Sequence, residues 1–313
     1  LIFTNNDSAY ETAIEFKKNG ILPVVLDTRS NVESEIIEEA KNMGIDIKFS
    51  HVVVAARGYK KVKYAEISKI SEDKKELGKI ENINCDCICV SGFWTPTIHL
   101  ASQSGNKTKF DEKIDAFVPG TSKQKETTLG SAKGIFTLEE TLKSSFEAGN
   151  EISKKITKKD NKISIPKVSE KKHAKHDKFW CVPLPQNKKY KRFLDFQNDV
   201  VITDVELALR EGYRSIEHVK RYTTLGMATD QGKTSNLNGL QLVSSIENKI
   251  VPAVGHTTFR PPYTPVTIGA IVGREVGKHS KPTRKSPMHY WHEKNNAIFV
   301  DAGIWLRPRY YKR

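Results

Sequence analysis

The hydrophobic positions at the start of the chain alternate between strand and helix periods. Leu1 to Thr4 and Ile21 to Asp27 are short apolar runs of the kind found in buried strands. Between them, Ser8 to Asn19 repeats its apolar residues at helical spacing, with Asp7 as the expected N-cap. This order predicts a βαβ unit. A second amphipathic helix and three strands are then predicted at Val32–Met43, Ile45–Phe49, His51–Ala56 and Val62–Ile70.

The same patterns continue in the middle of the chain. An apolar strand begins at Cys85 in the run CDCICVSGFWTPTIHL, and Gly134 to Phe136 with the helix Leu138–Ile156 predict a closing strand and helix. Three more helices are expected further on. They are Asp204–Glu211, capped by Thr203 with Glu206 in the capping box, Ile216–Tyr222 after Ser215, and a third from Thr234 or Ser235 to about Ile246.

Charge is unevenly distributed over the 313 residues. The net charge is +14, but thirteen lysines and one arginine stand against three acids between 154 and 192. A basic groove for nucleic acid spreads its cations over a folded face, with aromatic residues among them. The surplus here lies in one polar stretch, and lysine outnumbers arginine 39 to 12. We therefore interpret the stretch as a solvated linker and expect no nucleic-acid partner.

The four cysteines do not form a metal or disulfide pattern. Cys85, Cys87 and Cys89 alternate, so on a strand they share one face, which suits neither the spaced pairs of a zinc site nor a staggered disulfide framework. They are expected to be buried small hydrophobic residues. With no signal peptide and no apolar run of about 20 residues, we expect a cytoplasmic protein without a membrane partner.

The first βαβ turn is a weak nucleotide site. Asp27 has the spacing of the acid that holds a ribose in dinucleotide-binding folds. The turn itself, TNNDSA, contains no glycine and carries an aspartate where a phosphate would be repelled. Two interpretations stay open: dinucleotide binding at Asp27, or a Rossmann-like layer without a ligand.

A second candidate site lies between the second and third of the later helices. Hydroxyls, lysines, an arginine and a glycine stand beside a helix N-terminus in KRYTT and TDQGKTS, which are the groups that a phosphate site requires. A Walker A loop is excluded, because Gly226 and Gly232 enclose five residues rather than four. The alternative is a solvated connection between helices.

Four segments in sequence order carry a family resemblance. The runs TNNDSAY, VSGFWTPTIHLASQSG, EGYRSIEHVKRYTTLGMATDQGKTSN and TTFRPPYTPVTIGAIVGR resemble the alpha subunits of heterotetrameric sarcosine oxidases. The resemblance implies an internal fragment of such a subunit, inactive alone. It implies oxidative demethylation of sarcosine to glycine, with hydrogen peroxide and 5,10-methylenetetrahydrofolate or formaldehyde as products, and beta, gamma and delta subunits as partners.

The resemblance also implies cofactors. FAD is expected in the beta subunit, FMN between alpha and beta, and NAD and tetrahydrofolate in the full-length alpha subunit. The glycine-rich turn that would decide NAD binding is expected upstream of Leu1. No residue of this chain is assigned a catalytic role. Together with the anion chemistry, the resemblance makes these residues candidates for the FMN phosphate: Lys220, Arg221, Thr223, Thr224, Gly232, Lys233, Thr234 and Ser235.

The helical segment resembles the module that holds a [2Fe–2S] cluster in bacterioferritin-associated ferredoxin. Its two cysteine-bearing loops correspond here to Leu194–Gln197 and Thr229–Ser235, which contain no cysteine. Iron–sulfur ligation needs thiolates, so the cluster is expected to be lost.

The last part of the chain contains a strap and a tail. Three prolines predict an extended strap between Thr257 and Val266, either a surface linker or one that turns Arg260 and Tyr263 toward the flavin or a partner. The tail from Ser286 resembles the start of the aminomethyltransferase fold, which binds folate. His289 and His292 lack both the order of a zinc motif and a third ligand, so no metal is expected.

The predicted fold class is α/β, a partial two-dinucleotide-domain (Rossmann-like) flavoprotein fold, followed by the cluster-less helical module and the start of the folate domain. The segments are 1–153, the lysine-rich linker 154–191, the helical domain 192–250, the strap 251–285 and the tail 286–313. Two other functions stay open: a non-catalytic assembly module, or an alpha subunit of an opine, proline or cyanide-forming amine dehydrogenase. Those relatives generally retain cluster cysteines or lack the folate-like tail.

Overall fold

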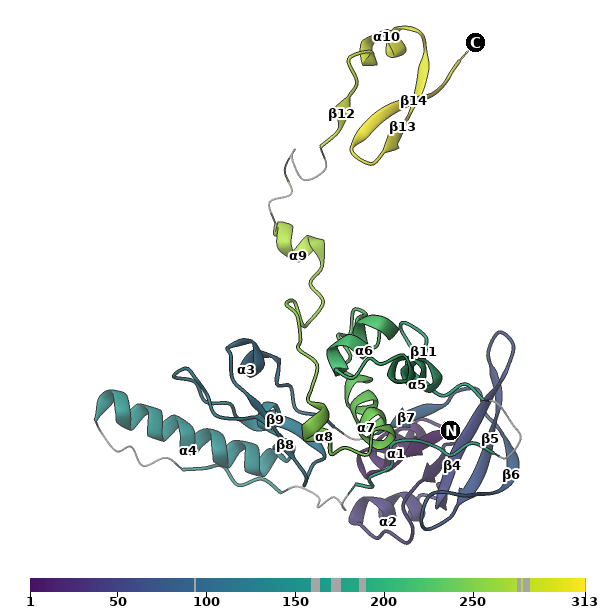
Figure 1. The fold of residues 1–313 in the computed structure, drawn as a ribbon, viewed down its shortest axis with the longest axis vertical. Coiled ribbons are helices and arrows are strands. Elements are labelled where there is room, and N and C mark those ends of the chain that lie inside the picture. The colour runs from purple at the N-terminus through teal and green to yellow at the C-terminus, as the bar shows by residue number, and fades with distance from the viewer. Residues whose placement is uncertain are drawn as a thin grey trace. The chain divides into compact units, whose positions relative to one another are not determined.

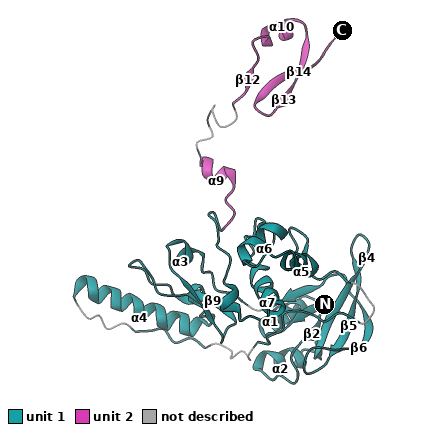
Figure 2. Cartoon of the chain, in the orientation of Figure 1, with its two compact units in different colours: residues 1–263 teal, residues 264–313 magenta. Residues whose placement is uncertain are grey.

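The computed structural model describes residues 1–92, 94–158, 164–169, 176–185, 190–274, 277 and 282–312. The chain divides into two compact units, Leu1–Tyr263 and Thr264–Arg313 (Figure 2). Both combine helices and strands, so the α/β class is confirmed. Among the described residues, no helix has the length and apolar character needed to span a membrane.

The predicted βαβ unit opens the first unit (Figure 1). Its strands form a parallel sheet in the order β3-β2-β1-β7. Tyr10, Ile14 and Ile37 of the two helices pack with Val25 in the core of this layer. The apolar residues whose spacing predicted these elements therefore form the faces that become buried. The elements are β1 (Ile2–Thr4), α1 (Ser8–Lys18), β2 (Val24–Asp27), α2 (Glu35–Asn42), β3 (Asp46–Phe49) and β7 (Cys89–Ser91).

An antiparallel sheet in the order β4-β5-β6 is inserted between β3 and β7. Its strands are β4 (His51–Gly58), β5 (Val62–Ile70) and β6 (Leu77–Asn84). The sequence pattern predicted the first two and missed β6. That strand is an edge strand with no buried residue, so charged and polar side chains occupy most of its positions and no alternation appears.

The cysteine-rich run differs from its prediction. Only Cys89 lies in a strand, while residues 85 to 88 form an irregular connection from β6 to β7. Cys85 and Cys89 are half-buried, but Cys87 is exposed. The expectation of three buried cysteines on one strand face is therefore wrong, because the strand begins four residues later than the apolar pattern suggested.

After β7 the chain forms a small antiparallel pair and a long helix. Helix α4 confirms the predicted helix, but no closing strand forms at residues 134 to 136, because Gly134 ends the preceding 3-10 helix in the left-handed region. None of the described residues of α4 is buried. The elements are α3 (His99–Gln103), β8 (Thr108–Asp111), β9 (Ala116–Pro119), η1 (Gly130–Lys133) and α4 (Leu138–Thr157).

The lysine-rich segment is only partly described, and its described part is not solvated throughout. The Asp177 side chain accepts a hydrogen bond from Thr28 Oγ1 at 2.9 Å and pairs with Lys74. Further along, the hydroxyl of Tyr190 donates to Glu66 at 2.8 Å. The chain at these points is fastened to the N-terminal sheets.

A helical layer completes the first unit. Its core contains Val205, Val219, Leu225 and Val243. Helix α5 begins at Ile202, and Asp204, not Glu206, accepts the backbone N–H of Val201 at 2.9 Å. The predicted cap at Thr203 is therefore wrong, since that residue is already inside the helix. The elements are β10 (Phe193–Asp195), β11 (Val200–Val201), α5 (Ile202–Arg210), α6 (Ile216–Thr223), α7 (Asn236–Ile246) and α8 (Val251–Val254).

The second unit is small. Strand β14 lies between β12 and β13 in a three-stranded sheet. His289 is buried against Phe299, with 4.6 Å between ring centroids, and His292 contacts the hydroxyl of Tyr311. Each histidine thus packs on an aromatic residue. The elements are α9 (Ile268–Val272), β12 (Arg284–Lys285), α10 (His289–Lys294), β13 (Ala297–Ala302) and β14 (Trp305–Tyr311).

Candidate functional site

The carboxyl ends of the parallel strands form the first place where a ligand is expected. The chain order reverses between β1 and β7, and ligands of open parallel sheets bind at such a point. Here Asn6 Nδ2 donates to the backbone and side-chain oxygens of Ser91, both at 3.2 Å, and Asn6 Oδ1 accepts the Ser8 hydroxyl. The polar groups of the turn therefore bond to one another across the two strands.

Asp27 lies in the same place and is fully buried. The Tyr10 hydroxyl donates to Asp27 Oδ2 at 2.8 Å, and Arg29 Nη2 donates to the same atom at 2.7 Å. Burial, followed by the Asp27 charge, holds the pKa of Tyr10 above its ordinary range, so the phenol stays protonated. The carboxylate predicted to bind a ribose is engaged within the chain.

Arg29 links this carboxylate to a second one. Its Nη1 atom lies 2.8 Å from Asp7 Oδ1, and all three side chains are buried. Asp177 approaches from the lysine-rich segment, where its backbone N–H donates to Asn5 O at 2.9 Å. Asp177 therefore covers this turn from the side of the lysine-rich segment.

The eight residues predicted for the FMN phosphate lie between the end of α6 and the start of α7, and the structure separates them into two groups. Four lie at the carboxyl end of α6, where the helix dipole disfavours an anion. Arg221 Nη1 lies 3.3 Å from Glu217 Oε2, and the Thr223 hydroxyl donates to Val219 O at 2.8 Å. Thr224 ends the helix with φ of 64°.

Lys220 is the member of this group that faces the strap. It is buried, and its Nζ donates to Thr258 O at 3.3 Å. Burial lowers the pKa of Lys220, Glu217 opposes this effect, and the charges of Arg260 and Arg221 lower it further. Glu217 is the anion next to this group, since its side chain also accepts the N–H of Thr258 at 2.7 Å.

The other four residues surround the start of α7. Gly232 N–H donates to Asp230 Oδ1 at 3.1 Å, and the Thr234 hydroxyl donates to Asp230 Oδ2 at 3.3 Å. Lys233 is exposed, whereas Ser235 is fully buried at the N-cap position. The Asp230 carboxylate therefore already accepts the donor that Gly232 was expected to offer.

Two buried oxygens at the start of α7 lack hydrogen bonds. Among the described residues, neither Ser235 Oγ nor Asn236 Oδ1 has a partner. Ser235 has helical backbone angles, so its hydroxyl does not cap the helix as an N-cap serine usually does. Unpaired buried polar atoms are costly, and a ligand or water supplies the missing bond where one is bound.

A small pocket adjoins this turn. Its volume is about 60 Å³, and Lys233, Asn236 and Leu240 line it on the α7 side. The Tyr263 ring stacks on His99 at 4.0 Å between centroids, and Lys233 Nζ lies 4.2 Å from the Tyr263 centroid. The strap thus places Tyr263 beside Lys233, which precedes α7, while Arg260 is exposed.

Sequence reasoning missed His99 and Asn236. His99 follows VSGFWTPTI, far from the phosphate loop in sequence, and only folding brings it to Tyr263. Asn236 looks like an ordinary first-turn residue of a helix. Its proximity to Gly232 is what distinguishes it, since a Cβ on that glycine would lie 2.2 Å from Asn236 Oδ1.

The two loops that correspond to a cluster site in the ferredoxin-like resemblance are bonded directly to each other. Asp195 is buried, and its Oδ2 accepts the Gly226 N–H at 2.9 Å. Its Oδ1 accepts the N–H of Gln197 at 2.9 Å, and Gln197 Oε1 accepts the N–H of Asp230 at 3.3 Å. Asp195 and Gln197 therefore fasten the segment that contains Gly226 and Asp230.

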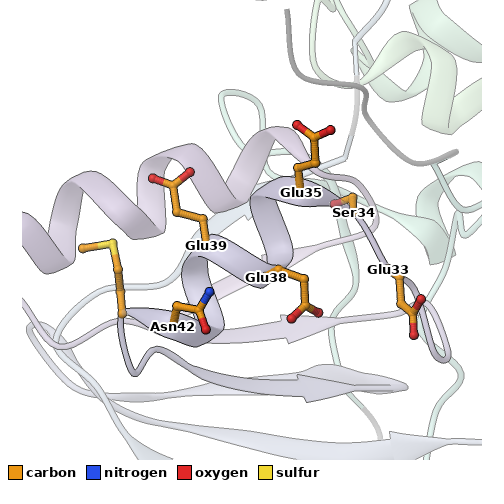
Figure 3. A pocket seen from close by; sticks show the side chains of 7 residues that line it. Glu33, Ser34, Glu35, Glu38, Glu39 and Asn42 are labelled. Atoms are coloured by element: carbon orange, nitrogen blue, oxygen red, sulfur yellow. The ribbon is translucent and has the colours of Figure 1, made fainter.

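A wider hollow lies over α2 and does not form a site. It has a volume of about 730 Å³ and is lined by Glu33, Glu35, Glu38 and Glu39. Figure 3 shows these side chains pointing away from the helix in different directions. Nowhere in the described segments do three or more acidic, histidine or cysteine side chains form a group suited to a metal ion.

Comparisons with known proteins agree along the whole chain. The sarcosine oxidase A3 domain family matches residues 189–274. The chain is 35% identical to "Sarcosine oxidase subunit alpha" of Rhizobium meliloti (strain 1021), over 100% of this chain and 30% of that protein. It is 32% identical to the protein of the same name from Corynebacterium sp. (strain P-1), over 99% of this chain and 33% of that protein. The chain thus spans about a third of the length of these relatives.

A solved structure shows the same fold. The L-proline dehydrogenase from P. horikoshii superimposes with a TM-score of 0.54 at 20% identity, covering 80% of this chain and 49% of that one. At this identity the likeness concerns the fold. This chain therefore has a fold similar to that of the L-proline dehydrogenase over 80% of its length.

Proposed function

Because the chain belongs to the family of sarcosine oxidase alpha subunits, we propose that it forms part of the alpha subunit of an enzyme that oxidises sarcosine. The overall reaction would demethylate sarcosine to glycine and yield hydrogen peroxide. The one-carbon unit would leave as 5,10-methylenetetrahydrofolate, or as formaldehyde without the folate. The beta, gamma and delta subunits would complete the enzyme.

The proposal assigns this chain a binding role rather than a catalytic one. FAD would lie in the beta subunit, and FMN would be shared between alpha and beta. NAD and tetrahydrofolate would bind elsewhere in the full-length alpha subunit. The bound FMN would supply electron transfer to oxygen, while the residues of this chain would hold its phosphate and keep its charge compensated.

The observation that carries the FMN assignment is the buried, unpaired hydroxyl of Ser235 at the start of α7. Ser235 Oγ can donate to a phosphate oxygen, and Lys233 at the pocket rim supplies a positive charge. The helix N-terminus adds a favourable dipole. Lys220 contributes charge from the α6 side, where Arg260 and Arg221 raise the local potential.

The volume of the pocket limits the size of the group that this chain can hold. Ligand sites usually measure about 300–1,000 Å³, and this pocket measures about 60 Å³. A pocket of this size cannot enclose a flavin ring, so in this proposal the chain would hold only the phosphate end of the cofactor. This division is what a cofactor shared between two polypeptides requires, with the ring against the partner.

The experiment is the flavin content of the complete complex carrying Lys233→Ala. We expect FMN per complex to fall by about tenfold, the effect of losing one charged contact, and FAD to stay unchanged. Lys41→Ala is the matched control, because Lys41 is an exposed lysine on α2 paired with Glu38. Unchanged FMN in the Lys233 variant rejects the phosphate site. Absence of sarcosine-dependent hydrogen peroxide from the unmodified complex would instead reject the proposed activity.

A further inference from the structure

Two thiols in the connection to β7 lie next to each other. Cys87 Sγ and Cys89 Sγ are 4.0 Å apart, and Cys87 is exposed. On a regular strand, two residues that are two positions apart are separated by about 6.6 Å. The irregular backbone of residues 85 to 88 is what allows the sulfur atoms to approach.

The geometry points to a peroxide-sensitive dithiol: Cys87 and Cys89 form a reversible disulfide when hydrogen peroxide or another hydroperoxide reaches them. Reactive cysteines are partly exposed and have a resolving thiol nearby, and this pair meets both conditions. The inference concerns a modification site, and it does not depend on the proposed oxidase activity.

The chemistry balances without another reagent. The exposed Cys87 thiolate attacks one peroxide oxygen, the O–O bond breaks, and hydroxide leaves and takes up a proton to form water, giving a sulfenic acid. Cys89 then loses its proton and attacks the Cys87 sulfur, and the S–O bond breaks to release a second water. Two thiols and one hydrogen peroxide become one disulfide and two waters, so the dithiol is oxidised by two electrons.

The other two cysteines have different surroundings. Cys85 packs against the cluster that contains Leu26 and Ile67, and burial raises the pKa of its thiol, as it does that of Cys89. Cys181 packs beside the helical core, and its sulfur lies 3.1 Å from Arg192 Nη1. The structure therefore singles out Cys87 as the entry point and Cys89 as its partner.

Oxidation would act on a strand that reaches the polar turn of the parallel sheet. Cys89 in β7 pairs with Ile2 in β1, and two residues later Ser91 O accepts a hydrogen bond from the Asn6 side-chain amide. A ring of so few residues is strained, and strained disulfides are easily reduced. The pair is thus suited to a transient change rather than to permanent cross-linking.

The experiment counts thiols in the full chain after hydrogen peroxide, with denaturation before the count and mass spectrometry to locate the disulfide. The chain has four cysteines. We expect two thiols to disappear, the mass to fall by two hydrogens, and dithiothreitol to restore both.

Single variants decide the assignment. Cys87→Ser and Cys89→Ser should each abolish the disulfide, whereas Cys85→Ser and Cys181→Ser should leave it intact. A disulfide that persists in Cys87→Ser, one that maps to Cys85, one that joins two chains, or oxidation of Cys87 to a sulfinic acid without pairing would each overturn the inference.

Discussion

Lys233 and Tyr263 contact each other in two ways. The Lys233 ammonium donates a hydrogen bond to the Tyr263 carbonyl oxygen at 3.0 Å and lies 4.2 Å from the centroid of the same residue's ring. The first contact involves the backbone and the second the side chain. Substitution of Tyr263 therefore separates them.

A double-mutant cycle with Tyr263→Leu and Lys233→Met should measure the ring contact. The backbone hydrogen bond is retained in Tyr263→Leu, so the coupling reports the cation–π interaction, about 0.5–1 kcal/mol at an exposed site. The free energy of unfolding from urea titration is the measurement. Additive effects of the two substitutions would show that the ring does not attract the ammonium.

Arg29→Ala should strongly destabilise the chain. It leaves Asp7 and Asp27 buried without their shared cation, and breaking a buried ion pair in this way costs about 3–5 kcal/mol. Arg57→Ala is the control, because Arg57 pairs with Glu66 at a partly exposed position, where the expected loss is at most about 1 kcal/mol. Equal losses in urea denaturation would contradict the role assigned to Arg29.

Two helical glycines should respond in opposite directions to alanine. In α7, a Cβ at Gly239 would lie 2.5 Å from Leu225 Cδ2 inside the helical core, so Gly239→Ala should cost about 1–3 kcal/mol. In α4, a Cβ at Gly149 meets nothing within 4 Å, and Gly149→Ala should stabilise by about 0.4–1 kcal/mol. Denaturation midpoints of the two variants test both signs. A stable Gly239→Ala variant would mean that Leu225 repacks freely.

The lowered pKa of His99 should decrease the free energy of unfolding of the chain in mild acid. Burial, with the Lys233 charge in addition, lowers the pKa of His99 below the unfolded value of about 6.5. Above that value both states are neutral and the group has no effect. As the pH falls below it, the unfolded chain takes up the proton first, so the free energy of unfolding decreases until the folded pKa is passed.

The check is the free energy of unfolding of the wild-type chain and of His99→Gln between about pH 5 and pH 8. Glutamine does not titrate, so the difference between the two curves should be flat above about pH 6.5 and should change below it in favour of the variant. A difference that stays constant over the whole range would contradict the lowered pKa.

The sequence predicted correctly those helices and strands that bury one face, because their apolar residues then recur with the period of the helix or strand. The βαβ unit and helix α7 are within a few residues of their predicted bounds, because one face of each is buried. Strand β6 was missed since an edge strand needs no apolar alternation. The start of α5 was misplaced because Thr203 has the side chain of a typical N-cap, whereas Val201 holds that position and Asp204 bonds to its N–H.

The amino-acid composition of the segment predicted where the candidate site lies. It could not predict which of the candidate residues are free to bind a ligand. The segment from Lys220 to Ser235 was identified from its charges and hydroxyls, yet six of the eight candidates bond within the chain. The sequence could not show that Asp230 would accept the Gly232 amide, nor that Ser235 would be buried with its hydroxyl unpaired. Those outcomes depend on backbone angles, as at Ser235.

The Asp195 carboxylate determines how this part of the chain is held together. It fastens the Gly226 loop with hydrogen bonds made entirely by the polypeptide, which form as soon as the helices fold. Because the closure consists of hydrogen bonds within one polypeptide, substitution of Asp195 would release the Gly226 N–H and the N–H of Gln197 together.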